Sequence, residues 1–420
     1  MSGDREIQAA GRVVGDALAG AVGVVRDTHQ AIADRAFAAW GPAARPIHAV
    51  HGAISGGVYA IVHGAHALLP RLIGAAVGYG WRPEQAPLSG HRAGRLTLAV
   101  VNGLWGDTIS GRHPELATPM AIRSRDEDVP PTAEALRAAF PAATERIAVF
   151  VHGLCETEEY WSLAARRHHG TEGTTLGSRL RRDLAYTPVY LRYNSGLHVS
   201  DNGLGLSALL DELVAHWPVA VERITLVGHS MGGLVIRSAG RQGVAAGHRW
   251  VPAARHVVFL GTPHLGAPLA RGVHATAWLL ARFPESRPVA RLLGQRSAGV
   301  QDLDYGSLVE EDWRDVDPDA LPIDSCTDVP FLPHANHYFI GATLARQHDG
   351  ALAAAVGDLF VPYRSAAGSG DRRRLPFGAD NGRHLGGLHH FDLLNHPQVH
   401  DQLCAWLAEP ESTATDGDQP

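Results

Sequence analysis

The sequence has 420 residues, more than one domain usually needs, so it predicts one large domain with an appended segment. With 45% hydrophobic and 19% charged residues it has the composition of an ordinary globular protein, which excludes a disordered chain and a coiled coil. A net charge of -6 offers no concentrated basic surface for phosphates, so we expect no nucleic-acid partner.

Secretion, disulfide bonds and membrane spans are not expected either. The three cysteines, Cys155, Cys326 and Cys404, lack the paired spacing of a disulfide framework, a redox motif or a zinc site. Residues 1–8 lack the basic start of a secretory signal, and the apolar run over residues 61–80 is interrupted by histidine, proline and arginine. We therefore expect a cytoplasmic protein without a membrane-spanning segment.

Residues 1–125 form the first predicted region, and their pattern is helical. Apolar residues recur there every three or four positions, which places them on one stripe of a helix. Such stripes can pack on one another or on the rest of the protein. They can also provide a peripheral membrane contact or a surface for a hydrophobic substrate, although few Lys or Arg residues are available to attract anionic headgroups. The clearest stripe consists of Ile47, Val50, Ile54, Val58 and Ile61.

From about Glu145 short apolar runs alternate with helical stretches, the signature of a parallel sheet flanked by helices. This pattern predicts a second domain over residues 145–408. A segment at about 268–330 is too long for a simple connection and is interpreted as a lid or cap, and the polar tail 409–420 is expected to be disordered. The expected strands are Ile147–Val151, Pro188–Tyr193, Ile224–Val227, His256–Leu260 and Tyr338–Ile340, and the expected helices are Thr175–Leu184, Leu204–Trp217 and Gly232–Arg241.

The strongest chemical signal is the pattern G-x-S-x-G at Gly228-His229-Ser230-Met231-Gly232. It follows an expected strand and precedes an expected helix, which is the setting of a nucleophile elbow. In such a turn the serine backbone is strained, and both glycines are needed because side chains there would collide with neighbouring backbone. The hydroxyl would lie at a helix N-terminus, whose partial positive charge favours a developing anion. We predict that Ser230 is a nucleophile.

A serine hydroxyl needs a base to remove its proton and a carboxylate to orient that base, and both should follow later strands. Asp358 is preferred to Asp349 as the carboxylate, because the apolar run after Asp358 would hold it in a structured turn. His389 and His390 both precede the last helical stretch, and their position alone leaves the choice between them open.

Two backbone amides would complete the site by binding the oxyanion of a tetrahedral intermediate. Met231 follows the predicted nucleophile, and Leu154 follows Gly153, which lets the chain turn sharply after a strand. We predict that the Leu154 and Met231 amides fill this role. No group of His, Cys, Asp or Glu has convincing metal-ligand spacing, so we expect no metal and no other cofactor.

Several motifs in chain order carry a family resemblance. They are Phe150-Val151-His152-Gly153-Leu154, Gly228-His229-Ser230-Met231-Gly232-Gly233, Gly261-Thr262-Pro263-His264-Leu265-Gly266, Gly357-Asp358, Val361-Pro362, Ser365-Ala366 and His390-Phe391. With them the chain resembles the bacterial triacylglycerol-lipase and GPI inositol-deacylase-like branch of the α/β-hydrolases, over about residues 145–407. The resemblance implies an α/β-hydrolase fold, Asp358 as the acid, His390 as the base and a lid after the G-T-P-H-x-G motif. The glycine that often follows the acid in that branch is Leu359 here.

Three hypotheses about function follow. The first is an esterase or lipase that hydrolyses a small-molecule or lipid ester, because a lid and apolar helices could cover a hydrophobic acyl chain. The second is an acyltransferase, which would use the same triad and differ only in what removes the acyl group from the serine. The third is a non-catalytic protein that binds a lipid or another partner on a hydrolase scaffold.

Overall fold

The computed structural model describes residues 88–90, 92–267, 296–314, 326–347 and 357–408, together with residues 9, 27, 30 and 34. The strands are β1 (Ala121–Ser124), β2 (Glu127–Val129), β3 (Arg146–Val151), β4 (Thr187–Arg192), β5 (Arg223–His229), β6 (Ala254–Leu260), β7 (Asn336–Thr343) and β8 (Gly382–Gly386). The longer helices are α3 (Arg92–Arg112), α4 (Ala133–Ala139), α6 (Leu176–Leu184), α7 (Val199–His216), α8 (Met231–Ala246) and α15 (Pro397–Leu407). Shorter helical segments are η2 (Leu88–Gly90), η3 (Pro114–Leu116), η4 (Glu158–Ser162), α5 (Ala165–His169), α9 (Trp250–Ala253), α12 (Ala298–Asp302), η5 (Glu310–Asp312), α14 (Tyr363–Ala366) and η6 (His390–Leu394).

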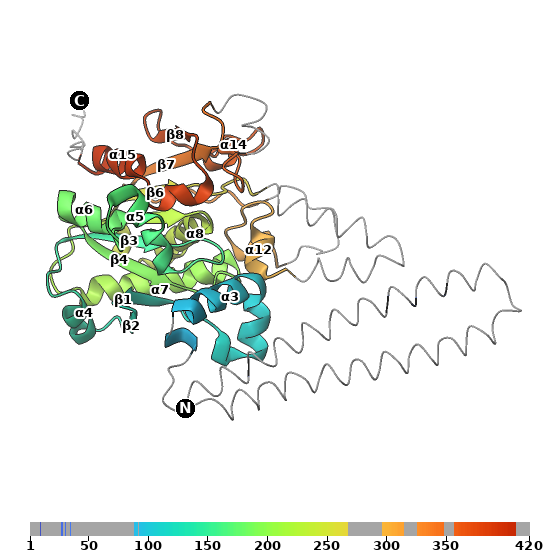
Figure 1. Ribbon diagram of the computed structural model, residues 1–420, viewed down its shortest axis with the longest axis horizontal. Coiled ribbons are helices and arrows are strands. Elements are labelled where there is room, and N and C mark those ends of the chain that lie inside the picture. Colours follow the sequence, from blue (N-terminus) through green and yellow to red (C-terminus); the bar gives the residue numbers. More distant parts are fainter. Residues whose placement is uncertain are drawn as a thin grey trace, which may run out of the picture.

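All described strands belong to one eight-stranded sheet with the order β2-β1-β4-β3-β5-β6-β7-β8 (Figure 1). Strand β1 runs antiparallel to both of its neighbours, and the pairs from β4 to β8 are parallel. The carboxyl ends of β3, β5 and β6 therefore meet at one edge of the sheet, where loops can bring distant residues together. This open, mostly parallel sheet with helices on both faces is the α/β-hydrolase fold that the motifs implied.

Successive residues of the strands feed two separate cores. Along β3, Val149 and Val151 face the layer of α7 and α8, whereas Ala148 and Phe150 face the layer of α6 and α15. This alternation follows from the two-residue period of a strand. Because both faces are covered, the central strands read as continuous apolar runs rather than as alternating ones. These continuous apolar runs are the reason why the central strands could be predicted from the sequence.

The five expected strands and three expected helices are confirmed, with bounds that shift by a few residues. The sheet nevertheless begins at Ala121, before the start at residue 145 that the sequence predicted, because β1 pairs with β4. Part of the region 1–125 that was expected to be helical is thus strand. The short strands β1, β2 and β8 were not predicted from the sequence. Strand β2 has two exposed acidic residues and β8 is largely polar, so neither has the apolar run of a buried strand. The stripe at residues 47–61 and the tail 409–420 lie outside the described residues.

Helix α3 packs against the loops that follow β3 and β4, although it belongs to the predicted N-terminal region (Figure 1). A side chain at Gly103 would lie 2.4 Å from Cys155 Sγ, so α3 approaches the loop after β3 closely. The predicted lid at 268–330 is described at residues 296–314 and 326–330. There, the Ser297 hydroxyl donates to the Gly103 carbonyl at 2.6 Å, which joins this segment to α3. Among the described helices none has the length and apolar character needed to cross a bilayer.

Candidate active site

The predicted nucleophile Ser230 joins β5 to α8 with φ 52° and ψ -124°. Positive φ is uncommon for a residue with a side chain and costs about 1–3 kcal/mol, which the surrounding structure must offset. The two flanking glycines explain how the turn fits. A Cβ at Gly228 would lie 2.6 Å from Gly233 Cα, and one at Gly232 would lie 2.3 Å from the Val151 carbonyl oxygen. The prediction that side chains at both positions would collide with backbone is confirmed.

The predicted base and acid lie in contact. His390 Nδ1 is 2.7 Å from Asp358 Oδ2, and the two side chains are 4% and 1% exposed. The other carboxylate oxygen, Oδ1, accepts the amides of Phe360 at 3.0 Å and Val361 at 2.8 Å. Because the carboxylate accepts, Nδ1 carries the ring proton and Nε2 is left able to accept one. The pair is thus arranged to take a proton from a neighbouring hydroxyl.

The competing candidates do not share this arrangement. His389 is 44% exposed on its side chain, and its Nε2 lies 3.4 Å from Asp392 Oδ1. Asp349 lies outside the described residues. The structure therefore brings His390, and not its neighbour, to Asp358.

The residue after Asp358 departs from the pattern of the resembling branch, and its backbone conformation is one that favours glycine. Leu359 has φ 94°, a backbone conformation that glycine adopts without strain and that is strained for leucine. The turn is closed by the amide of Asp358, which donates to the Val361 carbonyl at 3.3 Å. Glycine would fit this turn without strain, but this chain has leucine at the position.

Ser230 and His390 both lie next to the carboxyl end of β6. The Ser230 amide donates to the Leu260 carbonyl at 2.8 Å. A Cβ on the next residue, Gly261, would lie 3.0 Å from His390 Cε1, so the imidazole rests on that glycine. Within the described part of the chain the Ser230 hydroxyl makes no hydrogen bond. Catalytic hydrogen bonds are often long in a free enzyme and tighten when substrate binds.

The predicted oxyanion donors flank Ser230 on two sides. A Cβ at Gly153 would lie 2.9 Å from Ser230 Cβ, so the loop that carries Leu154 lies directly over the serine. Met231 is the first residue of α8, where an amide has no partner inside the helix. No hydrogen bond between described residues uses either amide. Both are free to bind a developing negative charge.

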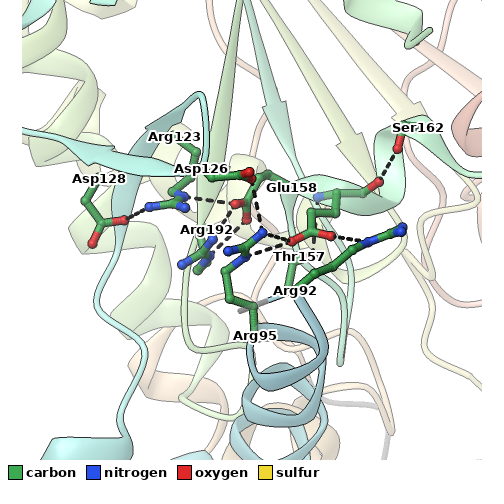
Figure 2. A network of polar contacts seen from close by, with 10 residues as sticks. Arg92, Arg95, Arg123, Asp126, Asp128, Thr157, Glu158, Ser162 and Arg192 are labelled. Carbon is green, nitrogen blue, oxygen red and sulfur yellow. Dashed lines mark hydrogen bonds and ion pairs between the residues drawn. The ribbon is translucent and has the colours of Figure 1, made fainter. Parts of the chain in front are cut away.

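A network of buried charges holds the loop after β3, as Figure 2 shows. Glu158 accepts from Arg123 of β1 at 2.9 Å and from Arg192 of β4 at 2.9 Å. Its neighbour Glu159 accepts from Arg95 of α3 at 2.8 Å. The loop is therefore tied at once to two strands and to α3. Helix α3, which sequence alone assigned to a separate region, helps to fix one wall of the site.

Two buried residues next to the site were not singled out from the sequence. Glu156 Oε1 lies 2.9 Å from His229 Nδ1, and Glu156 Oε2 accepts the Gly153 amide at 2.7 Å. Burial alone would raise the pKa of the Glu156 carboxyl and lower the pKa of the His229 imidazole. The charge and hydrogen bond of each partner outweigh burial, so the pKa of Glu156 is lowered and that of His229 is raised. The two are 73 positions apart, and no spacing rule links them.

One group of described side chains has the composition of a metal site: Asp183, His400 and Cys404. It belongs to α6 and α15, not to the loops around Ser230. Both Asp183 oxygens already accept from Arg182, at 2.6 and 2.7 Å. The Asp183 carboxylate is therefore already paired with a guanidinium group.

Comparison with known proteins supports the general class of serine ester hydrolases. Residues 142–297 match the model of a protein family described as "Putative serine esterase (DUF676)". This segment contains β3, β5, β6 and the Ser230 turn. No curated protein matches the sequence.

Similar solved structures include hydrolases from several organisms. The mature form of a lipase from Bacillus licheniformis is 19% identical, with a TM-score of 0.42 over 63% of this chain and 92% of that one. An α/β hydrolase fold protein from Chitinophaga pinensis is 12% identical, with a TM-score of 0.36 over 64% and 91% of the two chains. Lipase B from Aspergillus fumigatus is 12% identical, with a TM-score of 0.38 over 66% and 57%.

Proposed function

We propose that this chain hydrolyses carboxylic esters through an acyl intermediate on Ser230, with His390 as the base and Asp358 as the residue that orients it. The observation that carries the proposal is the strained turn of Ser230 beside the buried His390–Asp358 pair. A serine becomes a good nucleophile only when a positioned base takes its proton. The match of residues 142–297 to a serine esterase family points to the same reaction.

In the proposed reaction His390 moves protons in two steps. His390 Nε2 takes the proton of the Ser230 hydroxyl while the oxygen attacks the ester carbonyl carbon. The same nitrogen then gives its proton to the leaving alcohol as the tetrahedral intermediate collapses to the acyl-serine. In the second step a water molecule loses a proton to His390, attacks the acyl carbon and releases the acid, and Ser230 regains its proton.

The oxyanion of each tetrahedral intermediate would be bound by the amides of Leu154 and Met231. Both amides flank Ser230, and neither has a partner among the described residues. Fixed donors of this kind stabilise charge that develops only in the transition state, and losing one typically costs about 10²–10³ in kcat. The N-terminus of α8 adds a partial positive charge at the same point.

Apolar side chains next to the base favour an ester with a hydrophobic acyl chain. Leu359 and Phe360 follow Asp358 directly and are 53% and 42% exposed. The Phe360 ring lies 5.5 Å from the His390 ring and 5.6 Å from the Phe391 ring. Exposed aromatic and aliphatic groups that adjoin a polar site commonly bind the apolar part of a ligand.

Labelling with a fluorophosphonate, combined with a panel of chromogenic esters of increasing acyl length, tests this proposal. Wild type should be labelled and should hydrolyse the panel, whereas Ser230→Ala should do neither. Ser162→Ala is the matched control, since Ser162 only donates to the Glu159 carbonyl, and it should behave like wild type. Equal labelling of wild type and Ser230→Ala would refute the role of Ser230. A product ester formed in preference to the free acid when an alcohol competes would point to acyl transfer instead.

A further inference from the structure

The protons of His229 can be assigned from its contacts. Nδ1 lies 2.9 Å from Glu156 Oε1, and Nε2 lies 3.2 Å from the carbonyl oxygen of His390. A carbonyl oxygen can only accept, so Nε2 carries a proton. The lowered pKa of the Glu156 carboxyl favours its ionised form, and an ionised carboxylate requires a proton on Nδ1 as well. His229 is therefore an imidazolium, and with Glu156 it forms a buried ion pair.

This ion pair touches three segments that the proposed reaction needs. The Glu156 carboxylate accepts the amide of Gly153, the residue before the proposed oxyanion donor Leu154. His229 directly precedes Ser230 in the chain. Its Nε2 donates to the backbone of His390, which carries the proposed base. One pair of side chains thus links the oxyanion loop, the nucleophile turn and the base loop.

We propose that Glu156 and His229 are positioning residues whose hydrogen bonds hold the Leu154 amide, Ser230 and His390 in their reactive arrangement. This inference rests on the proposed function and deepens it. Neither residue is proposed to touch the substrate, because Glu156 is 3% and His229 is 0% exposed on the side chain. They act through the groups to which they are bonded.

Stability alone is a poor explanation for this pair. The cost of removing two charges from water offsets most of their attraction, and apolar side chains of similar volume often stabilise a protein as well or better. Packing does not require charge here either, since the His229 ring already contacts apolar neighbours such as Trp161, at 6.4 Å between ring centroids. The directed hydrogen bonds are what apolar residues could not supply.

Substitutions at Glu156 separate hydrogen bonding from packing. Glu156→Leu keeps the volume and removes the acceptor, so the Gly153 amide loses its partner. Misplacing a catalytic group by about 1 Å costs about 10²-fold, so kcat should fall about 100-fold while KM stays within about threefold. Glu156→Gln should retain most of the wild-type kcat. Its oxygen can accept from Gly153, and its NH₂ can donate to Nδ1 of a neutral His229 that still donates from Nε2.

The double variant Glu156→Leu/His229→Phe covers the case in which the single variant does not fold. It leaves neither member of the pair buried without the other, although the Gly153 amide and the His390 carbonyl still lose their partners. Its Tm should therefore be no lower than that of Glu156→Leu, while kcat falls as in Glu156→Leu. A wild-type kcat in the double variant, or an equal loss of kcat in Glu156→Gln and Glu156→Leu, would overturn this inference and leave the proposed function standing. If wild type itself hydrolyses no ester and is not labelled at Ser230, the proposed function fails and this inference fails with it.

Discussion

Asp358→Asn is the substitution that most sharply tests the proposed triad. In wild type, Oδ1 accepts the amides of Phe360 and Val361, and Oδ2 accepts Nδ1–H of His390 at 2.7 Å. An asparagine oxygen can keep both amides, but its NH₂ then faces His390 and donates to Nδ1. The imidazole must carry its proton on Nε2, the nitrogen that should accept the proton of Ser230.

The size of the effect follows from this change of tautomer. The same substitution in a serine protease triad lowers kcat by about 10⁴, and we expect a similar loss here. At about 1.4 kcal/mol for each factor of ten, the barrier rises by about 5.5 kcal/mol. All three hydrogen bonds survive, and only the one to His390 exchanges donor and acceptor, so the free energy of unfolding should change by less than about 1.5 kcal/mol.

Asp392→Asn is the matched control for this experiment. Asp392 accepts the amide of His389 at 3.0 Å and pairs with the ring of that residue, so the same chemical change is made beside the other candidate histidine. We expect a kcat near that of wild type, because a partly exposed pair contributes at most about 1 kcal/mol. Ester hydrolysis with a p-nitrophenyl ester, together with urea denaturation, measures both quantities. If Asp358→Asn keeps more than about a tenth of the wild-type kcat, or if Asp392→Asn loses more than Asp358→Asn, the assignment is refuted.

Two further predictions concern stability. Glu158→Gln should lower the free energy of unfolding by about 3 kcal/mol, because it removes the counter-charge of the buried Arg192 and leaves Arg123 with only the half-exposed Asp128. Burial by itself would raise the pKa of Glu158, but the hydrogen bonds and charges of these arginines lower it below the usual 4.5. The extra free energy of unfolding of wild type over Glu158→Gln should therefore be complete above pH 4.5 and should shrink as the pH falls through the lowered pKa. Urea denaturation of both proteins across pH 3–7 checks this, and an advantage that grows in acid would contradict it. Leu359→Gly should raise the free energy of unfolding by about 0.5–1 kcal/mol, since Leu359 is 53% exposed and holds φ 94°, and an unchanged or lower Tm would argue against strain there.

The sequence by itself determined the features that depend on neighbours in the chain. The apolar runs of β3, β5 and β6 and the helical stretch after Ser230 are local patterns, and they were enough to predict the strand–turn–helix unit. Gly228 was likewise predictable, because the collision that requires it, with Gly233, arises within that turn, whereas Gly232 is required by the Val151 carbonyl of β3 and was predicted only because it belongs to the motif.

Only the tertiary structure decided which distant side chains meet. His389 and His390 are adjacent in the chain, but only His390 contacts Asp358, which lies 32 positions earlier, whereas His389 pairs with Asp392. The assignment of α3 to the site and the pairing of Glu156 with His229 depend in the same way on contacts across the sheet edge. Local patterns report which backbone conformation a segment prefers, whereas these contacts exist only after loops from several strands have been packed together.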